Sequence, residues 1–289
     1  MTPTTATILD GRKTRDSLLP ALIKRAKALS HVPKLAIIQV GERPDSTSYI
    51  SAKKAFAEKV GVDVQHIQLP ENIEQTDLMK AIRECNVDPS VDGIILQLPL
   101  PEDIDRRATM DAIEPNKDVD RLTRESMRMW NEDPDALLPA TARGIRELLE
   151  YYEISLKGKK VCVVGRSELV GKPVAVMCEN AGAAVTVCHS KTPDVAAETS
   201  KADIVIVAAG KAGLIKRDYV KKGQIIIDVG INTITGEKLE DEIEAKRLVG
   251  DVDFDAVKDI VAAITPVPGG VGPMTVLALF ENLIDLCKN

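Results

Sequence analysis

Aromatic residues are scarce in this sequence: Phe, Trp and Tyr together make up 3% of its 289 residues. Proteins that bind single-stranded nucleic acid stack the bases on aromatic side chains, so this scarcity argues against such a function. Basic charge is also in short supply, because the net charge is −6. A general binder of nucleic acid or of anionic membranes needs a basic surface. We therefore predict no nucleic-acid partner and no membrane partner, although a local basic pocket for a small anion remains compatible with the composition.

Cysteine and histidine are few as well, at five and three residues. The cysteines form no Cys-x-x-Cys pair and the histidines are scattered, so we predict no metal site. Cys162 and Cys188 lie in apolar runs and should be small buried residues. No apolar run reaches the length of a membrane span, and the first 15 residues contain no apolar signal segment. The expected location is therefore cytoplasmic.

Short β-branched runs alternate with longer segments of helical period along the whole chain. This alternation is typical of βαβ units and of mainly parallel sheets. The fold class is therefore predicted to be α/β, with an N-terminal three-layer α/β domain and a C-terminal Rossmann-type parallel-sheet domain. The expected strands are residues 34–40, 62–69, 91–98, 160–165, 184–188, 203–208 and 224–229.

Two segments have the composition of domain boundaries. Residues 131–139 are rich in Asp, Glu and Pro and precede a helix expected to start near Thr141, a candidate N-cap. Residues 264–273, ITPVPGGVGP, precede a final apolar helix over 274–287. We therefore assign residues 1–139 to the first domain and 140–271 to the second. The last helix, within 272–289, is expected to return to the first domain, because chain termini often lie close together.

The segment KKVCVVGRSELVGKPVAVMCENAG has the pattern of a strand, a tight glycine turn and a helix. Gly165 ends the strand, Gly171 lies at the helix entrance, and Pro173 suits a first helical turn. Backbone N–H groups and the positive end of the helix would then face a pyrophosphate. The spacing is not Gly-x-Gly-x-x-Gly, so a plain strand-to-helix turn is an alternative. A Walker A loop is excluded for two reasons. Arg166 stands where the motif requires glycine, and Pro173 follows Lys172 where the motif requires Ser or Thr.

The end of the second strand of this domain indicates which dinucleotide would bind. NAD sites commonly carry an acidic residue there, roughly 20 residues after the glycines, to bind the ribose 2′-hydroxyl. Here the strand ends in His189, Ser190 and Lys191, with Arg166 in the preceding turn. Polar and cationic groups suit a 2′-phosphate, so the sequence favours NADP. The alternative for His189 is a partly exposed strand-end residue with no ligand.

The helix after Pro44 carries a lysine where an apolar residue is expected. At 100° per residue, Tyr49, Lys53, Phe56 and Val60 fall in one narrow stripe that should face protein. Lysine is seldom buried without a partner, and a lysine with a lowered pKa can act in proton transfer. The alternative is an aliphatic stem that covers the edge of the core while its ammonium group reaches water.

Polar residues follow the apolar strand in VDGIILQLPLP. Gln97 stands near its carboxyl end, where open α/β sheets bind ligands, and burying its amide costs free energy unless a partner is present. In KDVD, Asp118 and Asp120 should point the same way if the segment is extended; alternatively, one of them caps a turn. The later proline- and glycine-rich loop would let its backbone approach a planar ligand. Its candidate contacts are Pro268, Gly269 and Gly270.

Eight segments together resemble one enzyme family. They are SYISAKKAFAEKVG, DGIILQLPLP, KDVD, VVGRSELVGKP, TVCHSKT, IIDVGIN, GDVDF and ITPVPGGVGPMTV. They occur in the order found in the bifunctional methylenetetrahydrofolate dehydrogenase/methenyltetrahydrofolate cyclohydrolase family, and they span nearly the whole chain. The resemblance implies a cleft between the two domains, oxidation of 5,10-methylenetetrahydrofolate by NADP⁺, and hydrolysis of the methenyl product to 10-formyltetrahydrofolate. It also implies a homodimer.

The resemblance assigns roles to individual residues. Lys53 would be the key catalytic residue, above all for hydrolysis, and Gln97 would hydrogen-bond Lys53 and tune it. Tyr49 would stack on the aminobenzoate ring, and Asp120 would bind the pterin. Arg166 and Ser190 look like contacts of the 2′-phosphate. The full set of expected cofactor contacts is Gly165, Arg166, Ser167, Gly171, Ser190, Gly230 and Ile231.

The sequence departs from the family pattern between residues 121 and 142. Arg121 stands where the family usually has glycine, Ala140 replaces a usual cysteine, and residues 122–134 lack the family's glycines. Neither reaction needs a cysteine nucleophile, so the loss of the cysteine is expected to be harmless. Arg121 adds a bulky cation next to Asp120. We hypothesise that it alters substrate affinity or the balance of the two activities.

Three alternatives remain for comparison. Tyr49 and Lys53 match the Tyr-x-x-x-Lys pair of short-chain dehydrogenases, but in that family the pair follows the nucleotide-binding glycines, whereas here it precedes them by more than 100 residues. The second alternative is a family member that has only one of the two activities. The third is a degenerate folate or nucleotide sensor that has lost catalysis. Growth of NADPH absorbance with methylenetetrahydrofolate separates an enzyme from a sensor.

Overall fold

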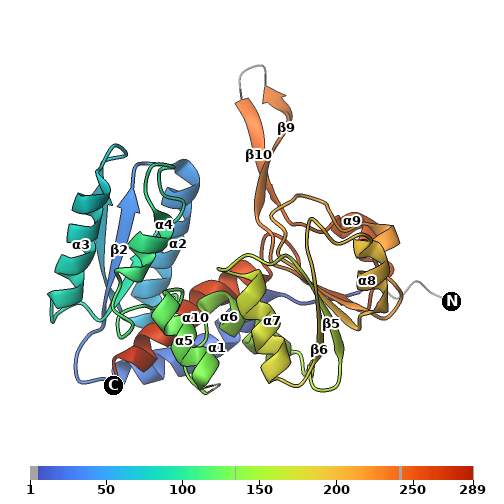
Figure 1. The fold of residues 1–289 in the computed structure, drawn as a ribbon, viewed down its shortest axis with the longest axis horizontal. Helices are drawn as coiled ribbons and strands as arrows, with labels where there is room; N and C mark the ends of the chain where they lie inside the picture. Colours follow the sequence, from blue (N-terminus) through green and yellow to red (C-terminus); the bar gives the residue numbers. More distant parts are fainter. Residues whose placement is uncertain (1–5, 134, 241–242, 289) are drawn as a thin grey trace. The chain divides into compact units, whose positions relative to one another are not determined.

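The computed structural model describes residues 6–133, 135–240 and 243–288, so Pro134 of the glycine-poor segment lies outside the described residues. The chain divides into two compact units (Figure 1). Unit 1 consists of the described residues of Met1–Arg15 and Thr141–Thr275, and unit 2 consists of those of Asp16–Ala140 and Val276–Asn289. The division passes through three helices, α1 (Gly11–Lys27), α6 (Ala140–Tyr151) and α10 (Val271–Leu286). Both units are built on parallel sheets, which confirms the predicted α/β class.

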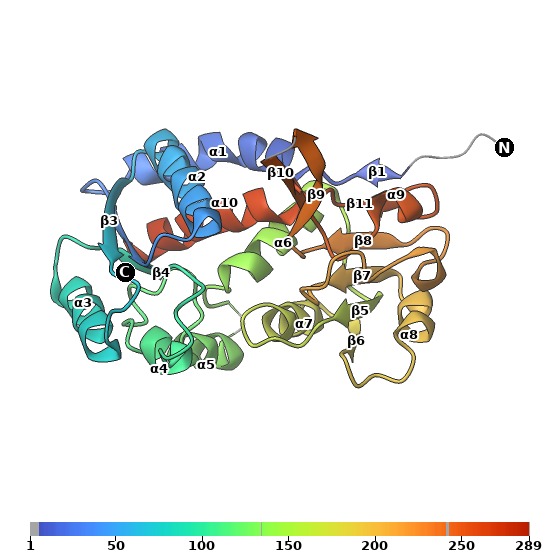
Figure 2. The ribbon, with the colours of Figure 1, turned by 90° about the horizontal axis from the view of Figure 1, so that it is seen from above.

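Unit 2 contains a three-stranded parallel sheet. Its strands are β2 (Lys34–Val40), β3 (Asp63–Leu69) and β4 (Gly93–Leu96), in the order β3-β2-β4. The crossover helices are α2 (Pro44–Val60) and α3 (Gln75–Val87). Figures 1 and 2 show α3 on one face of the sheet and α2 on the other, so the unit has three layers. Because the central strand β2 is covered on both faces, its sequence is almost continuously apolar, as is typical of buried parallel strands.

The chain after β4 adds two short helices and receives the C-terminal one. The short helices are α4 (Arg106–Asp111) and α5 (Arg124–Glu132). In α10, the Phe280 ring packs against Phe56 of α2 with ring centroids 5.3 Å apart. The buried Asn282 amide donates hydrogen bonds to the carbonyl oxygens of Val119 (2.9 Å) and Leu138 (3.0 Å). This amide therefore joins α10 to the loops on both sides of α5.

Unit 1 contains a six-stranded parallel sheet. Its strands are β1 (Thr7–Ile8), β5 (Lys160–Val164), β6 (Ala184–Cys188), β7 (Ile204–Val207), β8 (Ile225–Asp228) and β11 (Ala263–Ile264), in the order β1-β11-β8-β7-β5-β6. The helices α7 (Gly171–Asn180) and α8 (Val195–Lys201) connect β5 to β6 and β6 to β7. The chain passes from β5 outward to β6 and then returns past β5 to β7. Because right-handed crossovers that run in opposite directions lie on opposite faces of a sheet, α7 and α8 cover different faces, as Figures 1 and 2 show.

The core of unit 1 includes two of the cysteines. Cys162 and Cys188 are both buried with their sulfur atoms 3.6 Å apart, which confirms that they are small core residues. A close helix crossing lies in the same unit, where α6 meets the first turns of α10. A Cβ atom at Gly144 would lie 2.7 Å from the Met274 carbonyl group. Only glycine allows the two backbones this approach.

Several elements of unit 1 were not predicted from the sequence. The strands β9 (Asn232–Glu240) and β10 (Ile243–Val249) form an antiparallel ribbon that projects from the sheet in Figure 1. The short helices η1 (Arg217–Tyr219) and α9 (Phe254–Val257) were also not predicted. The helix expected to start near Thr141 begins at Ala140, so the proposal of Thr141 as its N-cap is wrong. Among the described residues, we find no helix both long and apolar enough to cross a membrane.

Candidate active site

Lys53, Gln97 and Asp120 meet at one pocket of unit 2. Lys53 Nζ donates a 3.0 Å hydrogen bond to Gln97 Oε1, and Gln97 Nε2 donates to the carbonyl oxygen of Leu98 at 2.8 Å. The second bond fixes the orientation of the amide, so that its oxygen faces the lysine. All three side chains line a cavity of about 150 Å³ whose other walls are largely apolar. The structure therefore brings together Lys53, its predicted partner Gln97 and Asp120, the residue predicted to bind the pterin.

The parallel sheet explains how these residues meet. Gln97 follows the last residue of β4, and its backbone N–H donates to the carbonyl oxygen of Ile38 at 2.8 Å, which keeps it in register with β2. Lys53 lies on α2, the helix that leaves the carboxyl end of β2. The carboxyl ends of parallel strands share one edge of a sheet, and this is where open α/β sheets bind ligands.

Burial in the pocket shifts the pKa of an amine and the pKa of a carboxyl group in opposite directions. Burial lowers the pKa of Lys53, and the charge of Asp120 partly opposes that shift. Burial also raises the pKa of Asp120, against the opposing charge of Lys53. Both shifts weaken the charged forms, so proton transfer at this amine becomes accessible closer to neutral pH. Such shifts are typical of a site for acid–base chemistry.

Asp118 and Asp120 have different tasks. The buried carboxylate of Asp118 accepts hydrogen bonds from the backbone N–H groups of Arg121 and Thr123, both at 2.9 Å. It caps the turn that follows, which is the alternative considered for one member of the pair. Asp120 is the member whose charge acts on Lys53. The capped turn positions Asp120 against the lysine.

The apolar stripe of α2 is buried at one end only. Phe56 and Val60 belong to the core, whereas Lys53 is partly buried and Tyr49 is exposed. The prediction that the whole stripe faces protein is wrong for Tyr49. Tyr49 lies one helical turn before Lys53, beyond the residues that line the small cavity. An exposed ring in this position is available to a ligand that extends out of the pocket.

Arg121 points away from the pocket. Its backbone is left-handed (φ 58°), which accounts for the glycine usual at this position in the family that the sequence resembles. The side chain is buried, donates to the carbonyl oxygen of Pro115 at 2.6 Å, and lines a different cavity. Its charge is not among those that shift the pKa of Asp120. This placement argues against the hypothesis that Arg121 acts on the substrate.

The glycine turn of unit 1 has the form expected of a phosphate-binding loop. Gly165 follows β5 with φ 125°, and a Cβ atom there would lie 2.1 Å from the carbonyl oxygen of Ala208. The turn leads into α7 at Gly171, whose N–H donates to Ser167 Oγ at 3.2 Å. The turn lies between the ends of β5 and β7, where the strand order reverses. That reversal marks the nucleotide site of open parallel sheets.

The register of β5 and β6 brings Arg166 and Ser190 together. Val164 of β5 and Cys188 of β6 are direct partners in this parallel pair. Arg166 lies two residues after Val164, and Ser190 lies two residues after Cys188. Both side chains are exposed at this edge of the sheet. A cation and a hydroxyl group at adjacent strand ends fit the 2′-phosphate of NADP, and the strand end carries no acidic residue to repel it.

Two buried aspartates order the loops at the same edge, and the sequence analysis missed both. Asp251 accepts backbone hydrogen bonds from Ala209, Gly210 and Lys211 at 2.7 to 2.9 Å. Asp228 accepts from the N–H groups of Gly230, Asp251 and Val252 at 2.9 to 3.0 Å. Each acid directly follows an apolar strand or a glycine. That position was the available signal. Their backbone donors show that both aspartates hold loops in place.

The remaining predicted contacts also lie in unit 1. Gly230 is packed so closely that a Cβ atom would lie 2.2 Å from the Asp251 carboxyl carbon, and the next residue, Ile231, is exposed. Pro268, Gly269 and Gly270 form the turn before α10. The carbonyl oxygen of Gly269 accepts from the N–H of Gly11 at 2.9 Å. These three residues belong to a different unit from Lys53.

Comparison with known proteins gives a consistent result. Residues 9–120 match the family model described as tetrahydrofolate dehydrogenase/cyclohydrolase, catalytic domain, and residues 139–289 match its NAD(P)-binding domain. A protein of Nautilia profundicola named bifunctional protein FolD is 44% identical over 286 residues, covering 98% of each chain. The structure of the FolD methylenetetrahydrofolate dehydrogenase/cyclohydrolase of Campylobacter jejuni aligns with TM-score 0.91 and 40% identity over 98% of this chain and 99% of that one. The Trypanosoma brucei enzyme, solved with NADP cofactor and an inhibitor, aligns with TM-score 0.92 and 35% identity over 98% of both chains.

Proposed function

Because the chain belongs to the tetrahydrofolate dehydrogenase/cyclohydrolase family, we propose that it oxidises 5,10-methylenetetrahydrofolate with NADP⁺ and hydrolyses the methenyl product to 10-formyltetrahydrofolate. The observation that carries this proposal is the hydrogen bond of 3.0 Å between Lys53 and Gln97 beside Asp120, in the pocket of unit 2. The substrate is a tetrahydrofolate derivative. A degenerate sensor would not need a lysine whose pKa is lowered beside Gln97 and Asp120.

The hydrolytic step assigns Lys53 its task. Water adds to the methenyl carbon and loses one proton; one carbon–nitrogen bond of the bridge then breaks to give the formyl group, and the second proton of the water ends on the nitrogen that is released. The amine of Lys53, neutral more readily because burial lowers its pKa, accepts the first proton. Gln97 holds the amine in place through its fixed amide oxygen. Asp120 binds the polar edge of the pterin, and Tyr49 stacks on the aminobenzoate ring outside the small cavity.

The oxidative step uses unit 1. Bound NADP⁺ would supply the hydride acceptor for the methylene carbon. Arg166 and Ser190 would hold its 2′-phosphate, and Gly165, Ser167 and Gly171 would form the turn against its pyrophosphate. Gly230 and Ile231 contact the cofactor beyond β8, and Pro268, Gly269 and Gly270 form a backbone surface for the planar substrate.

We also propose how the chain is organised. Folate chemistry belongs to residues 1–139 with the returning helix in 272–289, and cofactor binding belongs to 140–271. The protein acts as a cytoplasmic homodimer. Sedimentation of the purified protein measures the dimer, and a mass of one chain at micromolar concentration would contradict it. Fractionation of the source cells measures the location.

A side-by-side assay tests the proposed function. The purified protein is given methylenetetrahydrofolate with NADP⁺ or with NAD⁺, and the reduced cofactor and the methenyl intermediate are followed separately. We expect reduced cofactor with NADP⁺, a lower rate with NAD⁺, and a methenyl intermediate that rises and then decays. A lack of reduced cofactor with either nucleotide would overturn the dehydrogenase assignment, and a methenyl intermediate that decays no faster than without protein would overturn the hydrolase assignment.

A further inference from the structure

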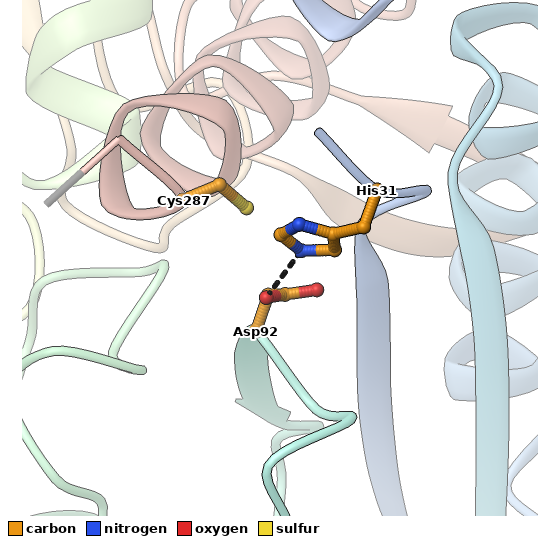
Figure 3. A group of neighbouring side chains, drawn as sticks. All are labelled: His31, Asp92 and Cys287. Atoms are coloured by element: carbon orange, nitrogen blue, oxygen red, sulfur yellow. Dashed lines mark hydrogen bonds and ion pairs between the residues drawn. The ribbon is translucent and has the colours of Figure 1, made fainter. Parts of the chain in front are cut away.

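A second group of reactive side chains lies in unit 2. His31, Asp92 and Cys287 offer an imidazole nitrogen, a carboxylate oxygen and a thiol sulfur, and these donor atoms lie within 4.8 Å of one another. Figure 3 shows the three side chains converging from separate segments: the loop before β2, the residue before β4, and the residue after α10. We propose that they form a binding site for a divalent transition-metal ion of the zinc class.

The donor set suits such an ion. Zinc takes nitrogen, sulfur and carboxylate oxygen ligands at about 2.0 to 2.3 Å in tetrahedral geometry, so its ligand atoms lie about 3 to 4 Å from one another. His31 Nε2 and Asp92 Oδ1 are already 2.9 Å apart. An ion between them replaces this single hydrogen bond by two metal bonds. The required movements of the side chains are therefore small.

Asp92 is held in place as a ligand should be. Its Oδ2 accepts a hydrogen bond of 2.8 Å from the backbone N–H of Lys34, and its own N–H donates to the Lys34 carbonyl oxygen at 2.9 Å. These two bonds anchor the residue to the amino edge of the sheet. Hydrogen bonds that orient a coordinating carboxylate are typical outer partners of metal ligands.

The donor set can neutralise a divalent cation. When an ion binds between Cys287 and Asp92, the Cys287 proton is released to water and the thiolate bonds to the metal. The thiolate and the Asp92 carboxylate then balance the two charges of the ion.

The site lies apart from the catalytic pocket. Asp92 precedes β4 and Gln97 follows it, so the two sites lie at opposite ends of this strand, roughly 16 Å apart at 3.3 Å per residue. Asp92 and Cys287 also line an open cavity of about 870 Å³. Three protein ligands leave the fourth tetrahedral position to water or a small anion from that cavity. The ion would join the end of the chain to the sheet without taking part in the folate chemistry.

Metal titration of the full-length protein tests this inference. Chelator-treated protein is titrated with Zn²⁺ in a calorimeter and, separately, with Co²⁺ in a spectrophotometer. We expect one Zn²⁺ per chain, and a Co²⁺ spectrum with a thiolate-to-metal charge-transfer band. His31→Ala and Cys287→Ser should each weaken Zn²⁺ binding by about 100-fold or more, above the effect of losing an outer partner. Cys287→Ser should also abolish the charge-transfer band.

A matched variant controls for thiols in general. Cys85→Ala removes a buried thiol of the same unit outside the cluster, and should leave Zn²⁺ affinity and the Co²⁺ band unchanged. The dehydrogenase rate of Cys287→Ser should equal that of the unmodified protein. His31 is exposed, so its replacement gives a folded protein for the comparison. Failure of the unmodified protein to bind Zn²⁺, or an affinity in His31→Ala and Cys287→Ser equal to that of the unmodified protein, would show an ordinary ion pair beside a thiol and overturn the inference.

Discussion

The chemistry of Lys53 depends on its surroundings, since its neighbour Lys54 has the same side chain in another setting. Lys53 faces Gln97 and Asp120, whereas Lys54 Nζ lies 3.0 Å from His66 Nδ1. We expect Lys53→Met to lower the rate of methenyl hydrolysis by about 100-fold or more, the usual range for losing a general acid or base. NADP⁺ affinity should be unchanged. The two measurements are hydrolysis of supplied methenyltetrahydrofolate and a fluorescence titration with NADPH.

Lys54→Met is the matched control for this substitution. It removes the same charge one residue further along α2, outside the cavity that Lys53 lines. Hydrolysis should stay within about twofold of the unmodified rate, as for most substitutions away from a site. Equal losses in the two variants would show that the charge of the helix matters and the position of Lys53 does not.

Arg121 shows why a departure from a family pattern is hard to interpret from sequence. Its position next to Asp120 suggested an effect on the substrate, but its side chain lines another cavity. We expect Arg121→Gly to leave the kinetic constants of both activities within about twofold, because glycine adopts the left-handed backbone freely. Steady-state kinetics per folded enzyme measures this. A tenfold change in the folate KM would restore the original hypothesis.

The acids that hold the loops were missed for a physical reason. A sequence shows that an aspartate follows an apolar strand, but the same position suits a ligand contact, an N-cap or a loop anchor. Lys53 and Gln97 were found because each interrupts an apolar pattern. Asp228 interrupts an apolar run as Gln97 does, and Asp251 follows a glycine, so a signal was present; only their backbone donors reveal that they hold loops.

At the scale of elements, strands with a clear apolar run were predictable. Residues 34–40 and 184–188 match β2 and β6 at both ends. The two-residue strands β1 and β11 were missed, because two residues carry no periodicity. The helix α5 was also missed; its signals were Thr123, whose hydroxyl group accepts from the N–H of Ser126 at 3.1 Å, and the buried Trp130.

Asp228, at the end of β8, should make the stability of the protein depend on pH. Burial raises the pKa of Asp228 to about 7, although its three backbone donors oppose the shift. In the unfolded chain this carboxyl titrates near pH 4. The folded protein therefore binds the proton more tightly between about pH 4 and 7, and the contribution of Asp228 to the free energy of unfolding falls as pH rises through that window. The loss is at most about 4 kcal/mol.

Two measurements check this pH dependence. The carbon-13 shift of the Asp228 carboxyl group should titrate near pH 7. Urea unfolding should show that the difference in stability between pH 5 and pH 8 is smaller in Asp228→Asn than in the unmodified protein, whatever the absolute stability of the variant. A midpoint near pH 4 would mean that the backbone donors outweigh the effect of burial.

At the scale of the whole molecule, the two activities should respond separately to changes in the two units. Arg166 lies in unit 1, at the edge where β5 and β6 end. We expect Arg166→Ala to raise the KM for NADP⁺ by about 10- to 100-fold, the cost of one charge-assisted hydrogen bond. The KM for NAD⁺ should hardly change, because NAD⁺ lacks the 2′-phosphate. Initial rates with each nucleotide measure both values.

The separation of the activities is checked with the same variant. Arg166→Ala should hydrolyse supplied methenyltetrahydrofolate at the unmodified rate, since Lys53 and its partners belong to unit 2. Arg217→Ala, which removes an exposed arginine of unit 1 before β8, is the control for charge and should leave all constants unchanged. Parallel losses of NADP⁺ and NAD⁺ activity in Arg166→Ala would place its contact elsewhere on the cofactor.

The crossing of α6 and α10 at Gly144 limits the evolution of this chain. With 2.7 Å between a would-be Cβ and the Met274 carbonyl group, no substitution at position 144 fits without moving a backbone. Glycine is therefore the only residue that fits here, and the constraint comes from the backbone contact in addition to the burial that Gly144 shares with Arg143 and Ile145. In a library of random variants selected for growth on one-carbon supply, position 144 should keep glycine even though it touches neither folate nor cofactor chemistry.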